Sequence, residues 1–108
     1  MTNAVMFWNR MRMEVTGHAN ADEKGKDIVC AGVSMITGAL IGMLEEAEAR
    51  GRTVAEWKWN EEKAQLVIWA DPNLGNLAEV KAYFRMCVKG LRMLHEEYPR
   101  YVDIKEVQ

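Results

Sequence analysis

Residues 27–51 read DIVCAGVSMITGALIGMLEEAEARG, and this segment decides the fold. Residues 28–44 carry no charge, and their apolar side chains recur at the three- and four-residue steps of a helix. Asp27 is a residue type favoured at a helix N-cap, and Gly51 is a type favoured just beyond a helix end. The pattern therefore predicts a helix from about Asp27 to Arg50.

The predicted helix has three sectors on a helical wheel. The first is an apolar stripe that should pack on a sheet, formed by Val29, Val33, Ile36, Leu40, Met43, Leu44 and Ala47. The second is a row of small residues at which another backbone could approach, formed by Ala31, Gly38, Gly42 and Ala49. The third holds Cys30, Ser34, Thr37 and Ile41. Because a sheet covers only one side of a helix that is apolar all round, we expect a partner chain and predict a homodimer.

The segments on either side of this helix predict a sheet. Within residues 11–16, Met11, Met13 and Val15 alternate with polar side chains, which is the pattern of a half-buried strand. The predicted strands are residues 3–8, 11–16, 53–60, 63–70 and 101–107, of which the first four form two hairpins.

A second helix is predicted from a cap at Asn76 to just before Pro99, with Glu79 completing a capping box. Its core stripe is Leu77, Val80, Phe84, Cys87, Val88, Leu91, Leu94 and Tyr98. The order of elements predicts an α+β fold with two layers: a mostly antiparallel sheet of about five strands and two helices packed on one face. At 108 residues, the chain 1–108 should form a single domain.

Composition narrows the class of function. The net charge of −2 argues against a nucleic-acid partner, because nucleic-acid binding needs a basic face. Two cysteines do not make a disulfide framework, and residues 1–9 do not have the pattern of a signal peptide, so we expect a cytoplasmic protein with free thiols. The run 28–44 is shorter than the roughly 20 residues that span a bilayer, so no membrane is expected. Two scattered cysteines and two distant histidines predict no metal and no cofactor.

Cys30 is the candidate nucleophile. With Asp27 as the cap, Cys30 would lie in the first helical turn, where unpaired backbone N–H groups and the positive end of the helix favour a thiolate. The alternative is a small buried apolar side chain, which is the usual role of a cysteine in an apolar helix. Cys87, on the core stripe of the second helix, fits that second role.

Four further residues are candidates for the same site. His18 follows a predicted strand and could act as general base, provided that the loop 18–26 folds back toward Cys30. Gly17 permits backbone angles that could aim His18. Asp27 is either only the helix cap or an orienting group for His18. Ser34 lies on the same side of the helix as Cys30 and could contact substrate or donate a hydrogen bond to a carbonyl of its own helix. The loop has no large apolar anchor, so whether His18 is preplaced or arrives with substrate stays open.

The motif Gly17-His18-Ala19, Gly25 and Asp27-Ile-Val-Cys-Ala-Gly-Val-Ser34 resembles the signature of the ribosomal-processing cysteine protease family. The resemblance implies a Cys–His endopeptidase, with Cys30 and His18 as the dyad, that removes a short N-terminal extension from a large-subunit ribosomal protein precursor. It also implies a homodimer. The cleavage-site preference does not follow from it.

Two alternatives remain. The chain could be a non-catalytic dimeric interaction module in which Cys30 is inert, or a protease acting on another precursor, such as a phage structural protein.

Overall fold

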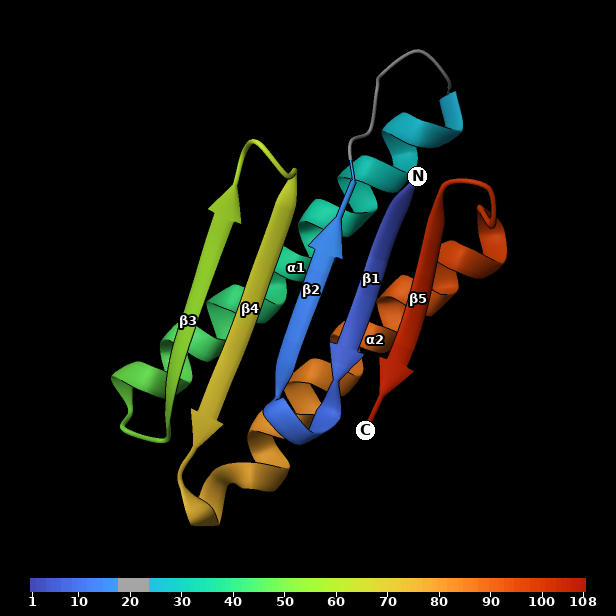
Figure 1. Ribbon diagram of the computed structural model, residues 1–108. Helices are drawn as coiled ribbons and strands as arrows, with labels where there is room; N and C mark the ends of the chain where they lie inside the picture. Colours follow the sequence, from blue (N-terminus) through green and yellow to red (C-terminus); the bar gives the residue numbers. More distant parts are fainter. Residues whose placement is uncertain (18–23) are drawn as a thin grey trace.

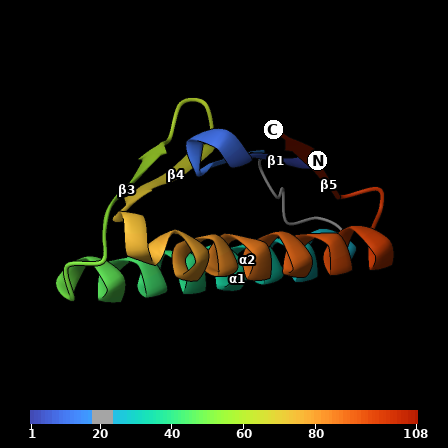
Figure 2. The same ribbon diagram turned by 90° about the horizontal axis from the view of Figure 1, so that it is seen from below.

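The structure is a computed structural model that describes residues 1–17 and 24–108, with only the backbone of residues 24–27. The elements in chain order are β1 (Thr2–Phe7), η1 (Trp8–Arg10), β2 (Arg12–Thr16), α1 (Lys24–Ala49), β3 (Thr53–Asn60), β4 (Gln65–Pro72), η2 (Leu74–Asn76), α2 (Leu77–Glu97) and β5 (Val102–Val107). The five strands form one sheet in the order β3-β4-β2-β1-β5 (Figure 1), in which only the β1–β5 pair is parallel. Both helices lie on one face of that sheet (Figure 2). The predicted α+β fold is therefore confirmed.

Helix α1 ends where the sequence predicts and begins earlier. Gly51 has φ +71°, and its N–H donates to the carbonyl of Glu48 at 3.0 Å, while the N–H of Arg52 donates to the carbonyl of Ala47 at 2.9 Å. This pair of bonds is a Schellman motif that closes the helix. At the other end α1 begins at Lys24, so Asp27 is the fourth helical residue. The expectation that Asp27 caps the helix is wrong, because the helix continues through Gly25 and Lys26.

The start of α2 also differs from expectation. Asn76 makes no side-chain cap hydrogen bond. Glu79 does not turn back to form a capping box, because its carboxylate accepts hydrogen bonds from Arg52, at 3.0 and 3.1 Å, and from the hydroxyl of Tyr83. Glu79 thereby joins the first turn of α2 to the connection between α1 and β3.

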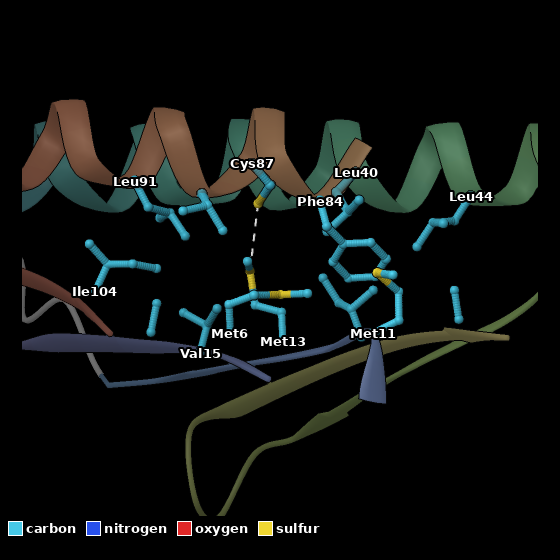
Figure 3. Close-up of a cluster of buried hydrophobic side chains, with 14 of the residues drawn as sticks. Met6, Met11, Met13, Val15, Leu40, Leu44, Phe84, Cys87, Leu91 and Ile104 are labelled. Carbon is cyan, nitrogen blue, oxygen red and sulfur yellow. Dashed lines mark hydrogen bonds between the residues drawn. The ribbon is translucent and has the colours of Figure 1, made fainter. Parts of the chain in front are cut away.

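The core lies between the sheet and the two helices (Figure 3). Fully buried side chains of every layer meet there, among them Met6, Met13, Ile68, Phe84 and Leu91. From α1 the core receives Leu40 and Leu44 fully and Val33, Ile36 and Ile41 in part; Val29 and Ala47 are also buried. Met43 was predicted on this stripe but is 41% exposed, because it lies beside the surface groove between α1 and α2.

Glycines allow the two helices to approach closely. A Cβ at Gly32 would lie 2.9 Å from a methyl of Leu94, and a Cβ at Gly90 would lie 2.7 Å from Cδ1 of Ile36. By contrast, within the described residues no atom comes within 4 Å of a Cβ at Gly38 or Gly42. The predicted row of small residues therefore does not contact α2.

The outer face of α1, which we define as Ile28, Ala31, Met35 and Gly42, is turned away from the sheet. Residues Ile28–Ala49 are long and apolar enough to cross a membrane by length and composition alone, a test that single helices of soluble proteins also pass. Within the described residues, 22% of the most apolar window of this helix is buried.

The carboxylate of Glu79 makes the stability of the folded protein depend on pH in the acid range. Its hydrogen bond from Tyr83 and then its contact with Arg52 lower the pKa of Glu79 below its ordinary value. The ionised carboxylate therefore stabilises the fold above the unfolded-state pKa, and this contribution is lost as pH falls through the lower folded-state pKa. We predict that Glu79→Gln lowers the thermal midpoint at pH 7 and shows a smaller decline toward pH 3 than the wild type, as measured by circular dichroism.

The control is Glu62→Gln in the exposed β3–β4 turn, which removes one charge without these partners. Identical pH profiles for Glu79→Gln and Glu62→Gln would contradict the assignment.

Candidate active site

Cys30 is an exposed free thiol on α1. Its neighbour Val29 is only 1% exposed. Because successive residues of a helix are turned by about 100°, the burial of Val29 directs Cys30 out of the core. The structure thus assigns Cys30 an accessible position and excludes the alternative in which Cys30 is a buried apolar side chain.

Cys30 lies in the second turn of α1, as the seventh helical residue after a start at Lys24. The expectation of a first-turn position is therefore wrong. The influence of the helix dipole falls off within the first turn, and the backbone N–H at the seventh position is bonded inside the helix. Activation of the thiol at this position consequently requires a nearby base more than it requires the helix end.

Gly17 determines where the chain leaves β2. Its φ of +138° is rarely adopted by other residues, and a Cβ would lie 2.3 Å from the carbonyl oxygen of Met1. Its N–H donates to the carbonyl of Ala64 at 3.0 Å. Only glycine therefore fits between the start of β1 and the β3–β4 turn, while the expectation that Gly17 aims His18 stays a prediction.

His18 lies outside the described residues, as does the rest of the segment 18–23. Figure 1 shows the end of β2 and the first turns of α1 at the same end of the molecule. Gly17, the residue before His18, thus lies at the end of the molecule where α1 begins, and the role of His18 as general base stays a prediction. The side chain of Asp27 is also outside the description, and its orienting role stays a prediction.

Ser34 is exposed one turn after Cys30. In this sector Thr37 makes the side-chain hydrogen bond to the preceding helical turn: its hydroxyl donates to the carbonyl of Val33 at 2.8 Å. Thr37 is 4% exposed, and Ile41 is half-buried. This sector of α1 is therefore exposed at Cys30 and Ser34, and buried or half-buried further along the helix at Thr37 and Ile41.

The second cysteine and the second histidine have structural positions. Cys87 lies in the core with its Sγ 3.6 Å from Sδ of Met13 (Figure 3), and burial raises the pKa of its thiol to about 12. His95 Nδ1 lies 2.7 Å from the carbonyl oxygen of Val102, which joins α2 to β5. In residues 1–17 and 24–108, no group of three His, Cys, Asp or Glu side chains could hold a metal ion.

The sequence interpretation missed two tryptophans near this sector. Trp57 and Trp59 of β3 lie opposite Ile68 and Leu66 of β4, and directly opposed residues share one face of a sheet. Ile68 and Leu66 belong to the core side. Trp57 and Trp59 are two positions apart in one strand and so share a face, but their half-exposure depends on how the helix layer covers that face.

Comparison with known proteins identifies the family. Residues 1–103 match the sequence profile of the family described as cysteine protease Prp. The chain belongs to the Prp family. The resemblance noted in the motif around Cys30 is thereby confirmed, and the chain is a member of a family of cysteine proteases. No curated protein matches the sequence.

Solved structures share the fold of this Prp-family chain. The essential ribosomal processing protease Prp from S. aureus has been solved with a covalently linked product peptide, at TM-score 0.73, and with a substrate peptide, at TM-score 0.74. Each has 20% sequence identity and covers 98% of this chain and 99% of the other. SMU.848 from Streptococcus mutans has TM-score 0.70 and 24% identity, covering 98% of this chain and 91% of its own. At these identities the likeness establishes the common fold.

Proposed function

We propose that this chain is a cytoplasmic cysteine endopeptidase that removes a short N-terminal extension from a large-subunit ribosomal protein precursor. The observation that carries the proposal is the position of Cys30: an exposed thiol on a helix fixed to the sheet, inside the motif shared with the Prp family. The S. aureus ribosomal processing protease, which has the same fold, supports the substrate class.

In the proposed mechanism His18 takes the proton of the Cys30 thiol, and the thiolate attacks the carbonyl carbon of the scissile bond. The protonated imidazole then gives its proton to the leaving amine. A thioester between Cys30 and the N-terminal fragment remains, and water hydrolyses it with His18 again as base. The position of Cys30 in the second turn supports a histidine partner, because the helix end alone provides little activation there.

We predict that Cys30→Ala and His18→Ala each lower cleavage of the purified ribosomal precursor more than about a thousandfold. Cys30→Ala should keep the wild-type circular dichroism spectrum, because the side chain is exposed and alanine suits a helix. The matched control is Cys87→Ala, which should keep activity and lose on the order of 1 kcal/mol of stability through a small core truncation.

The cut is mapped by mass spectrometry. Full activity of Cys30→Ala would overturn the nucleophile assignment. If the wild-type protein leaves the ribosomal precursor intact but cuts a phage structural precursor, the proposed ribosomal substrate is wrong and the proposed endopeptidase activity stands.

We also propose a homodimer formed through the helix layer. The outer face of α1 adjoins a groove of about 600 Å³ between α1 and α2, whose methionines are largely exposed. Those methionines are Met35, Met43, Met86 and Met93, exposed by 75, 41, 74 and 65%. A second copy would cover these flexible apolar side chains, which adapt readily to a partner surface.

We predict a dimer mass by light scattering at micromolar concentration and weaker association in Gly42→Lys. A side chain at Gly42 meets no atom of the described residues within 4 Å, so the monomer should tolerate the change. The control is Gln65→Lys, on β4 in the sheet and away from the helix layer. A monomer mass for the unmodified chain would rule out the dimer, and a protein that stays in solution only with detergent would point to a membrane instead.

A further inference from the structure

The exposure of Trp57 and Trp59 is unusual for their position. Both lie on the core side of the sheet, opposite Ile68 and Leu66. Ile68 is 0% exposed, whereas Trp57 and Trp59 are 48% and 52% exposed. Two indoles on the helix side of an edge strand are thus only about half-covered, although side chains of this kind gain most from burial.

Trp57 borders the side of α1 on which the Cys30 sector lies. A hollow of about 190 Å³ lies between α1 and β3, and Trp57, Ile41 and Ile68 line it. Ile41 is the last member of the sector Cys30, Ser34, Thr37 and Ile41, whose members recur every three or four residues along α1. The hollow beside Trp57 therefore continues the same side of α1 that carries the exposed thiol.

One end of this hollow is closed. The carboxylate of Glu48 on α1 accepts a hydrogen bond from the N–H of Ala55 at 3.1 Å, which holds the start of β3 against the helix. From there β3 and α1 diverge, and Figure 2 shows the β3–β4 turn standing away from the helix layer. The hollow thus lies at the Glu48 end of this side of α1, and Ser34 and Cys30 are exposed toward the other end.

The proposed dimer does not cover these tryptophans. On a wheel of 100° per residue, Cys30 is turned about 100° from Ala31 and about 120° from Gly42, both of which belong to the outer face of α1. A copy seated on the outer face contacts a different side of the helix. The occupant that suits the tryptophans is the molecule that must also reach Cys30, and this is the substrate.

Resting on the proposed function, we propose that Trp57 and Trp59 form the specificity wall of the substrate groove and contact apolar side chains N-terminal to the scissile bond. The flat indoles offer large apolar surfaces at low cost in side-chain entropy. The segment N-terminal to the cut is the part that distinguishes a precursor from its mature product. A wall that reads this segment explains why two tryptophans on the core side of the sheet are left half-exposed.

The test compares Trp57→Ala and Trp59→Ala with Trp69→Ala. Trp69 lies on β4 opposite Glu56, one position from the core-side residue Ile68, and so on the other face of the same sheet. Two peptide substrates are used: one spans the cut of the ribosomal precursor, and the other carries only its N-terminal side followed by a fluorogenic amine. We expect Trp57→Ala and Trp59→Ala to raise KM about ten- to hundredfold for both substrates, with Trp69→Ala close to wild type.

Two further readouts separate this inference from other roles of the tryptophans. The rate of Cys30 alkylation by iodoacetamide should be unchanged in all three variants, and Trp59→Phe should restore most of the lost kcat/KM. Unchanged KM in Trp57→Ala and Trp59→Ala would overturn the inference, as would a loss confined to the substrate with residues on both sides of the cut. A loss of dimer mass in these variants would assign the tryptophans to a second copy.

Failure of the proposed function has a different signature. Titration calorimetry of the N-terminal extension peptide is done with the Cys30→Ala protein, with and without Trp59→Ala. If the wild type cleaves neither substrate but Trp59→Ala weakens peptide binding about tenfold or more, the enzyme proposal fails and the binding wall stands. If the Cys30→Ala proteins with and without Trp59→Ala bind the peptide equally well, the proposed role of Trp59 in substrate binding is wrong, whether or not the wild type cleaves the substrates.

Discussion

The burial of one side of α1 against the sheet is the constraint on which the rest depends. Leu40, Leu44 and Val29 are each 3% exposed or less, so the helix cannot rotate without removing them from the protein interior. Once that side is fixed, the 100° step between residues gives every other side chain its direction. Gly32 meets α2, Ala31 and Gly42 form the outer face, and Cys30 points out of the remaining side. The packed stripe thus directs Cys30 and the proposed dimer face to two different sides of the helix.

The sheet supplies the second half of the site by its connections. Gly17 ends β2 in a conformation that only glycine adopts there, at the end of the molecule where α1 begins. At the opposite end, the Schellman motif at Gly51 and the contact of Glu48 with Ala55 return the chain directly to β3. These two turns fix where the chain leaves β2 and where it enters β3 relative to α1. The site is therefore a product of topology as much as of the motif.

The sequence patterns predict those parts of the fold that depend on interactions between residues close together in the chain. The alternation in β2 places Met13 and Val15 in the core, and the glycine at position 51 ends α1 because its left-handed φ is a local preference. The start of α1 was misplaced, since a cap preference is statistical and an aspartate is equally stable within the first turn of a helix. The capping box failed for a different reason. Glu79 binds Arg52, which is 27 residues away, and no local pattern contains that contact.

The candidate site was predictable only in part for the same reason. The motif identifies Cys30 as a candidate, and the helical period predicts which residues lie on the same side of α1. The period does not predict which side of α1 packs against α2, the sheet or solvent. The close helix contact thus falls at Gly32 and Gly90 instead of Gly38 and Gly42. The exposure of Trp57 and Trp59 likewise depends on the angle between α1 and β3, which is a property of the assembled layers.

Covalent trapping shows whether the exposed thiol of α1 attacks the substrate at the scissile position, as we propose. The N-terminal extension of the ribosomal precursor, ending in a chloromethyl ketone at the scissile position, is incubated with the wild-type protein. Intact mass and peptide mapping then locate the adduct. We expect one adduct per chain, on Cys30, formed faster than with a scrambled peptide and absent from Cys87. An adduct elsewhere, or equal rates for the two peptides, would contradict the proposal.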